Sequence, residues 1–376
     1  MTGEGFGVEV RPAESRRDRA RFVDFPYRLY RGHPHWVPPL RISVPPLLGD
    51  PRNPFWREAR IALFLAEEGG RTVGRIAAIE YPAHNRFWED RVGFFGFFDA
   101  VDDPRVSRPL LDAAARWLAA RGFERIRGPA NPSTNHECGL LVDGFEHDNV
   151  LQMPYNDPYY ARLLLDWGLA KEIDLYAYKI ASTPTPPPAL ERLVRRAQRA
   201  GRVEVRNLQV KDFAREVERV REIYNDAWEA NWGFVPLSAE EFDFISRDLK
   251  QVVRPELCYL ALIDGEPAAF SIGLPNMNEC LKGTGGRLFP FGLAKLLLGM
   301  KRTRSMRVIT LGVKKKFQNR GIPAAFYMRT MMDCHRLGIE WGEGSWILEN
   351  NVLMNRVLEN LGADRYKTYR IYGKPL

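Results

Sequence analysis

Two stretches of the chain combine short apolar runs with a glycine-containing turn. Residues 64–70 end in Gly-Gly and are followed by an apolar stretch at 72–78. Residues 259–265 end in Asp-Gly and are followed by an apolar stretch at 268–272. Apolar runs of this length on both sides of a tight turn predict a β-hairpin in each half of the chain.

The same order of helix and strand recurs later in each half. Residues 109–121 have amphipathic helical spacing and lead through a glycine into a predicted strand at 123–126, and residues 324–337 lead in the same way into 339–341. Four residue types also recur near the end of each half, in the pairs Asn156 and Asn350, Arg162 and Arg356, Gly168 and Gly362, and Tyr178 and Tyr372. These repeats indicate a duplicated α/β unit of about 180 residues.

Proline-rich segments divide the chain. Four prolines within 184–188 favour extended backbone and interrupt both helix and sheet. We therefore expect an N-terminal domain at 1–180, a proline-rich linker with a helix at 181–202, and a C-terminal domain at 203–376. A second proline-rich stretch, 33–46, is expected to be an irregular arm of the first domain.

Composition adds a localised charge to this picture. The 376 residues are 45% apolar and 27% charged, which excludes a disordered or fibrous chain. Lys and Arg number 55 against 47 Asp and Glu, and 12 of these cations lie within 281–332, where there is no acid. A negatively charged ligand or partner is therefore expected there. We expect no nucleic acid as partner, because the sequence has no recognised reading motif.

Neither a leader segment nor a membrane span is predicted. Residues 1–19 are polar and charged, and no apolar run reaches the roughly 18 residues of a spanning helix. Cys138, Cys258, Cys280 and Cys334 form no CxxC pair, which favours reduced thiols and leaves a disulfide open. We expect a cytoplasmic protein. Because no His or Cys spacing is typical of zinc, we expect no metal.

The strongest local signal lies inside the basic stretch. An apolar strand at 307–313 is followed by a basic turn that contains Gly321, and by a helix that starts near Pro323. Backbone N–H groups at a helix start bind phosphate, and glycine allows a close approach. The turn adds the cations Lys314, Lys315, Lys316 and Arg320. A solvated basic turn is the alternative interpretation.

The motif Gln318-x-x-Gly321-x-Pro323 resembles the pyrophosphate loop of the GCN5-related N-acetyltransferase (GNAT) superfamily, which holds the diphosphate of an acyl-coenzyme A. The resemblance implies acyl-CoA or acetyl-CoA as co-substrate. The cofactor-binding residues that it implies are Leu311, Gly312, Val313, Gln318, Asn319, Arg320, Gly321, Ile322, Ala324 and Asn351.

Longer motifs resemble the YghO-like family of two-domain GNAT proteins, which includes bacterial ceramide synthases. They are HPHWVPPL at 33–40, GPANPSTNHECG at 128–139, MPYNDPYY at 153–160, LFPFGLAK at 288–295 and SWILENN at 345–351. The resemblance implies an α/β (α+β) fold of two tandem GNAT-like domains, each a mixed, mostly antiparallel sheet flanked by helices. It also implies transfer of an acyl group from coenzyme A to a primary amine, with a long-chain, sphingoid-like amine as a candidate acceptor.

Three features depart from the superfamily pattern. Pro323 removes one backbone N–H from the phosphate loop, which the first turn of a helix tolerates. Leu358 stands where many acetyltransferases have a tyrosine that protonates the leaving thiolate. The equivalent turn of the N-terminal half, 99–107, has three aspartates and no glycine and would repel a diphosphate. We therefore expect coenzyme A in the C-terminal domain only, beside a degenerate N-terminal copy that shapes the acceptor site.

Amide formation needs a base for the amine and a polarised carbonyl. Glu343 is the first candidate base, because it lies on a strand, 339–347, that should splay from the cofactor-bearing strand. A backbone N–H of 311–313 would polarise the carbonyl, as the resemblance implies. The further candidates are Glu349 and Glu340 as bases and Tyr369 and Tyr372 as substitute acids. Packing or surface roles are the alternatives for all of them.

A proline-bounded polar run in the first half is the candidate acceptor site. Its match to the family motif implies a role in the acceptor pocket. The motif at 153–160 adds Tyr155 to this candidate site. The residues are Asn131, Ser133, Asn135, Glu137 and Tyr155. A set of ordinary turns is the alternative.

Residues 287–304 form a short apolar helix flanked by cations. This pattern suits contact with an anionic inner-membrane face or a lid over an acyl chain, with an ordinary core helix as the alternative.

Two other functions stay open for the protein as a whole. They are an acetyl-CoA N-acetyltransferase of a small or peptidyl amine, and a non-catalytic membrane-binding module. The sequence does not predict acyl-chain length or oligomeric state.

Overall fold

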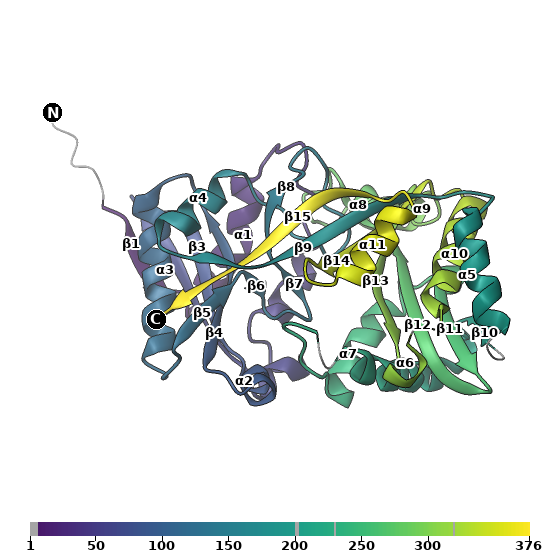
Figure 1. Ribbon diagram of the computed structural model, residues 1–376. Helices are drawn as coiled ribbons and strands as arrows, with labels where there is room; N and C mark the ends of the chain where they lie inside the picture. The colour runs from purple at the N-terminus through teal and green to yellow at the C-terminus, as the bar shows by residue number, and fades with distance from the viewer. Residues whose placement is uncertain (1–6, 200–202, 229–230, 319) are drawn as a thin grey trace. The chain divides into compact units, whose positions relative to one another are not determined.

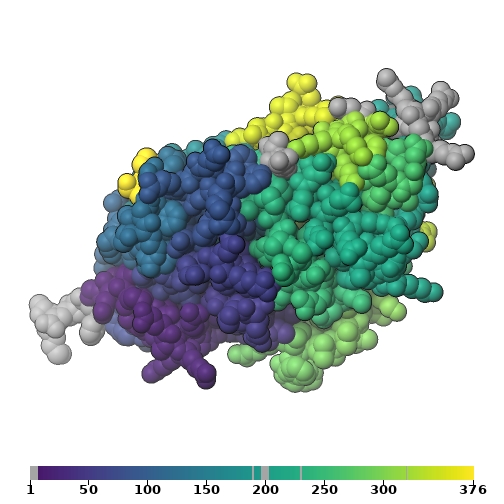
Figure 2. All heavy atoms as spheres, turned by 90° about the horizontal axis from the view of Figure 1, so that it is seen from below, coloured from purple at the N-terminus to yellow at the C-terminus, as the bar shows by residue number. Residues whose placement is uncertain are grey.

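The computed structural model describes residues 7–199, 203–228, 231–318 and 320–376. Internal contacts divide the chain into two compact units. Unit 1 comprises Met1–Leu175, Leu281–Leu293 and Lys367–Leu376, and unit 2 comprises Tyr176–Cys280 and Ala294–Tyr366. Each unit has a mixed sheet with helices packed on it, which confirms the predicted α/β class (Figure 1; Figure 2 shows all heavy atoms).

The sheet of unit 1 is built around the first predicted hairpin. Its strands in spatial order are β1 (Glu9–Pro12), β2 (Arg60–Glu68), β3 (Arg71–Glu80), β4 (Val92–Ala100), β5 (Arg125–Gly128) and β15 (Asp364–Pro375). Neighbours pair antiparallel, except that β4 and β5 are parallel. β8 (Leu140–Asp143) also pairs with β15, and β6 (Ala130–Asn131) pairs with β7 (Glu137–Cys138).

Helices cover the sheet of unit 1. They are α1 (Arg16–Leu29), α2 (Pro82–Trp88), α3 (Pro104–Ala119) and α4 (Tyr159–Asp166). Both α1 and α3 pack against β2, β3 and β4, so that the middle of β3 is buried on its two faces. Helix α3 begins before the predicted start at residue 109, because the side chain of Asp103 caps it by accepting the N–H of Arg105 at 2.8 Å.

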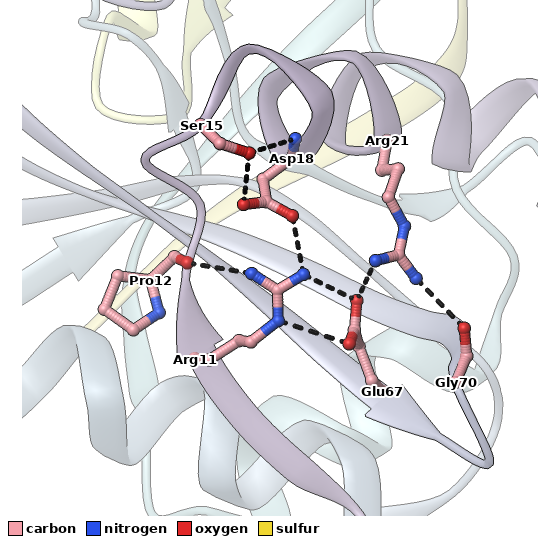
Figure 3. A network of polar contacts seen from close by, with 7 residues as sticks. All are labelled: Arg11, Pro12, Ser15, Asp18, Arg21, Glu67 and Gly70. Atoms are coloured by element: carbon pink, nitrogen blue, oxygen red, sulfur yellow. Dashed lines mark hydrogen bonds and ion pairs between the residues drawn. The ribbon is translucent and has the colours of Figure 1, made fainter.

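A polar network holds the start of α1 against the sheet of unit 1 (Figure 3). Arg11 on β1 donates to Asp18 at 2.5 Å and to Glu67 on β2 at 3.0 Å. Arg21 pairs with the same Glu67 at 2.6 Å, and Ser15 caps the helix. The Arg11 guanidinium holds the pKa of Asp18 well below its ordinary value. The network thus joins β1, α1 and β2.

Unit 2 repeats this architecture around the second predicted hairpin. Its strands in spatial order are β14 (Trp341–Leu348), β13 (Ser305–Val313), β12 (Glu266–Pro275), β11 (Cys258–Ile263) and β10 (Val203–Asn207). They pair antiparallel, except that β13 and β14 are parallel. The helices are α5 (Pro188–Arg199), α6 (Phe213–Ala227), α7 (Ala239–Leu249), α8 (Asn278–Leu281), α9 (Gly292–Gly299), α10 (Ile322–Arg336) and α11 (Val352–Asn360).

The chain passes from one unit to the other within regular elements. One change lies inside β9 (Ala170–Ala181), and another lies inside β15, whose residues from Lys367 onward belong to unit 1. The remaining changes lie at the end of α8 and inside α9. The final strand of the sequence is therefore part of the first unit's sheet.

Candidate active site

The two parallel strands of unit 2 separate partway along their length. Their ladder joins Ser305 to Trp341 and ends with the pairs Arg307–Glu343 and Val308–Gly344. Both strands continue beyond this point, β13 to Val313 and β14 to Leu348. The predicted splay of the Glu343 strand is present, with Glu343 one pair before the place where the strands part.

A β-bulge lies directly after the last ladder pair. Thr310 pairs with Ile272 of β12, and Val308 pairs with Gly273, so that Ile309 is an extra residue on β13. A bulge bends its strand and frees a backbone segment from the ladder. It therefore presents β13 backbone at the opening between β13 and β14. The sequence analysis missed this bulge, because a single inserted residue leaves no compositional signal.

The basic turn after β13 leads into an open helix start. Gly321 adopts a left-handed conformation with φ 74° at the N-cap of α10, and it contributes no side-chain cap. Ile322 and Pro323 are the first two helical residues, so that proline replaces an N–H that would have no partner inside the helix. Gln318 is extended. The predicted cofactor residue Asn319 lies outside the described residues.

Two of the turn's cations point to acids of unit 2. The buried Lys314 ammonium lies 2.5 Å from Glu222 and 3.4 Å from Glu266. Lys316 pairs with the same Glu266 at 2.6 Å. Arg320 is exposed and lies over the ring of Phe317. Of these three cations, Arg320 is therefore the best placed for a ligand's charge.

Other predicted cofactor residues have evident packing roles. A Cβ on Gly312 would come within 2.8 Å of the Trp228 ring, so glycine is needed for this contact. The Asn351 side chain caps α11 by accepting the N–H of Met354 at 3.2 Å. Leu358 is buried beside Tyr178, so that the position of the missing tyrosine is filled by core packing.

Glu343 lies at the centre of a buried polar cluster of unit 2. Its side chain is fully buried, and Ser345 donates to it at 2.5 Å. The hydroxyl of Tyr366 donates to its other carboxylate oxygen. Arg307, its partner in the ladder, lies 3.7 Å from the carboxylate and donates to Ser345 at 2.9 Å. A buried carboxylate with these donors is held in one orientation.

The other predicted acids and bases lie elsewhere. Glu340 is exposed and pairs with Arg304, and Glu349 follows the end of β14. Tyr369 and Tyr372 are fully buried in unit 1, where burial raises the pKa of Tyr372. The tyrosine that meets Glu343 is Tyr366, which is not among the candidates named from the sequence. Its position three residues before Tyr369 places it on the other face of the strand.

Unit 1 contains the same splay and bulge, but its own chain fills the opening. The parallel ladder of β4 and β5 ends with Phe94 and Arg127, and Phe97 and Phe98 then face a single residue of β3. The side chain of Asn131 on β6 accepts the N–H of Phe97 at 2.5 Å. A Cβ on Gly96 would lie 1.7 Å from the carbonyl oxygen of Ala130. The predicted acceptor residue Asn131 therefore accepts a hydrogen bond from the bulge of unit 1 and occupies the opening there.

The remaining predicted acceptor residues also make contacts inside unit 1. Ser133 is buried and lies 2.9 Å from Nδ1 of His136, whose pKa is lowered to about 4 by burial. Asn135 donates its backbone N–H to Ser133 at 3.2 Å, and Glu137 lies on β7. The Tyr155 hydroxyl donates to the carbonyl of Phe145 at 2.9 Å. A role for these residues in acceptor binding stays a prediction.

The described residues contain neither a candidate membrane span nor a candidate metal centre. In the part of the chain that the structure describes, no helix is long and apolar enough to cross a membrane. Among the same residues, no cluster of three or more His, Cys, Asp or Glu side chains could hold a metal ion. The four cysteines are buried with free thiols.

Comparison with solved structures identifies the fold of the chain. The chain is similar to a tandem GNAT protein from the clavulanic acid biosynthesis pathway, with a TM-score of 0.58, 11% identity and 98% coverage of both chains. It is also similar to a GCN5-related N-acetyltransferase from Anabaena variabilis ATCC 29413, with a TM-score of 0.50, 11% identity, and coverage of 98% of this chain and 72% of that one. The chain thus has a tandem GNAT fold.

Two curated proteins give the family, although no protein-family profile matches the chain. The chain is 40% identical to the bacterial ceramide synthase of Caulobacter vibrioides over 98% of both proteins. It is 38% identical to protein YghO of Escherichia coli K12, covering 98% of this chain and 95% of that protein. The chain belongs to the family that contains these two proteins, which confirms the resemblance found in its motifs. Family and fold together support an acyltransferase-type function.

Proposed function

We propose that the protein is an N-acyltransferase that moves an acyl group from coenzyme A to a primary amine, with a long-chain amine as the preferred acceptor. The observation that carries the proposal is the opening between β13 and β14, which starts one pair after the buried Glu343. The name of the Caulobacter relative supports a sphingoid-like amine as acceptor.

The residues of unit 2 fit a coenzyme A thioester. Past the ladder, β13 residues 308–311 are partly exposed, so the strand can accept the amide groups of an extended chain along its freed edge. The diphosphate would lie at the start of α10, where Gly321 adds no side-chain cap and the helix N-terminus favours negative charge. In unit 1 the equivalent helix start is capped by Asp103, and β6 fills the bulge. These contrasts support a coenzyme site in unit 2 alone.

The proposed reaction forms a C–N bond and breaks the C–S bond of the thioester. Backbone N–H groups beside the Ile309 bulge would stabilise the oxyanion that forms on the carbonyl. The Tyr366 oxygen would accept a proton from the attacking amine while its own proton passes to Glu343. Coenzyme A leaves as a thiolate, which can depart without a general acid because a thiol pKa of roughly 8.5 makes it a weak base, and it then takes a proton from solvent.

Arg307 and Ser345 have a supporting part in this proposal. Arg307 donates a hydrogen bond to Ser345, and Ser345 donates one to Glu343. In the proposed reaction the proton therefore reaches the Glu343 carboxylate from Tyr366. Burial of the cluster excludes water from the carboxylate and strengthens these contacts. Tyr366 is half-buried and is the member of the cluster placed nearest to solvent.

A thiol-release assay tests the proposal. The full chain is incubated with palmitoyl-CoA or acetyl-CoA and a panel of sphingoid, small and peptidyl amines, and free thiol and N-acyl product are both measured. We expect amine-dependent thiol release with palmitoyl-CoA and a long-chain amine. Turnover with acetyl-CoA and small amines alone would assign the protein to acetyl transfer. Absence of product with every pair would contradict an enzymatic function.

A further inference from the structure

Residues 287–302, which include α9, expose an unusual amount of apolar surface. Phe289 and Phe291 have 74% and 80% of their surface exposed, and Leu297 and Leu298 have 60% and 73%. Exposed apolar patches of this kind in a folded protein mark an interaction site. The ordinary core helix that the sequence left open is therefore wrong for this segment. In Figure 2 the atoms in the light green of this part of the sequence face solvent.

One further exposed apolar residue, Ile42, lies near the start of this segment in unit 1. The backbone N–H of Arg41 donates to the carbonyl of Gly286 at 2.9 Å, and its guanidinium donates to Gly285 at 3.3 Å. Ile42, which follows Arg41 in the chain and is 68% exposed, is therefore held near the start of the segment in space. The start of the segment, which belongs to unit 1 as far as Leu293, is thus supported by contacts inside that unit.

The charge of the segment selects one kind of partner. No acid occurs between Glu279 and Asp333, while residues 287–302 contain Arg287, Lys295, Lys301 and Arg302, all of them exposed. Arg304, which follows, pairs with Glu340 and is therefore not counted in this group. Exposed aromatic and leucine side chains among cations suit the interface of an anionic bilayer, where rings enter the acyl boundary and cations meet lipid phosphates.

We propose that residues 287–302 dock the protein on the surface of an anionic phospholipid bilayer. The Phe289 and Phe291 rings enter the interface together with Leu297 and Leu298, and Lys301 and Arg302 contact the headgroups. This inference concerns attachment and is independent of the proposed acyl transfer. A long-chain amine, if it is the acceptor, partitions into the same interface.

Flotation of the full chain with vesicles tests this proposal. Vesicles of phosphatidylcholine alone are compared with vesicles that contain a quarter phosphatidylglycerol, at low and high salt. We expect binding to the anionic vesicles that weakens with salt. F289S/F291S should lower the partition coefficient by about tenfold or more, and K301Q/R302Q should lower it by about fivefold for each cation.

Matched variants in unit 1 serve as controls. Leu165→Ser changes another half-exposed leucine, and R16Q/R17Q removes two adjacent exposed cations from α1. Both should bind like the unaltered chain. Failure of the unaltered chain to bind anionic vesicles, or binding that F289S/F291S leaves unchanged, would overturn the proposal. A dimer that F289S/F291S converts into a monomer, without vesicle binding, would assign the surface to a second copy of the chain.

Discussion

The residue that decides the proposed chemistry is one that the sequence did not single out. Three tyrosines on the last strand have the same chemical character, and the sequence analysis chose Tyr369 and Tyr372. The structure gives the contact with Glu343 to Tyr366. Which of several like residues meets a partner depends on long-range pairing, and local spacing does not encode it. Glu343 itself was predictable, because its place near the splay follows from the order of strands.

Tyr366→Phe should lower kcat by about a hundredfold, because it removes the hydroxyl that carries the amine proton and keeps the ring against Trp341. The apparent affinity for coenzyme A should not change. The matched control is Tyr176→Phe, on β9 of unit 2. Steady-state kinetics with palmitoyl-CoA provide the measurement. Equal kcat in Tyr366→Phe and the unaltered chain would remove Tyr366 from the mechanism.

A buried histidine gives stability a pH dependence in unit 1. His84 is buried, its ring packs against Phe94, and burial lowers its pKa to about 3. Arg127 and Asp90 lie beside it. In the unfolded chain His84 binds a proton as the pH falls through about 6.5, whereas in the folded chain it binds one only near pH 3. The stability of the fold therefore decreases as the pH falls through this window, by about 2 kcal/mol at pH 5.

Thermal unfolding at pH 7 and pH 5 tests this effect. His84→Gln should reduce the difference in Tm between the two pH values, since glutamine does not titrate. His147→Gln, which replaces a more exposed histidine of unit 1, should leave the difference as it is. A pH dependence that His84→Gln does not alter would contradict the assignment.

At the scale of elements, the same helix has different starts in the two units. Helix α3 is capped by the Asp103 carboxylate, while α10 begins at a glycine with no side-chain cap. From the three aspartates of 99–107 the sequence predicted repulsion of a diphosphate in unit 1, and it did not predict the helix cap. In the structure those aspartates pair with arginines, namely Asp99 with Arg75, Asp102 with Arg162 and Asp103 with Arg105. The cap and the β6 segment, more than net repulsion, close the site of unit 1.

Gly321→Asp should weaken coenzyme A binding by tenfold or more. The new carboxylate would accept the free N–H groups of α10 and repel the diphosphate, as Asp103 does in unit 1. Gly338→Asp is the control, because Gly338 follows the other end of α10 with the same φ of 74°. Calorimetry with coenzyme A measures both. Similar weakening in the two variants would assign the effect to backbone strain.

At the scale of the whole molecule, the duplication was visible in the sequence and the exchange of strands was not. Paired hairpins, helices and glycines predicted two similar α/β units, and both bulged, splayed sheets are present. The final strand, however, is in the sheet of unit 1 from Lys367 onward. Pairing of β15 with β5 and β8 depends on contacts of high sequence separation, which repeats and periodicity do not reveal.

The central claim is that only the opening between β13 and β14 accepts coenzyme A. A crystal structure of the full chain with bound coenzyme A tests it most directly. We predict the diphosphate at the start of α10 beside Gly321, and the extended arm of the cofactor between β13 and β14. Coenzyme A bound at the start of α3, or along β4 of unit 1, would contradict the account.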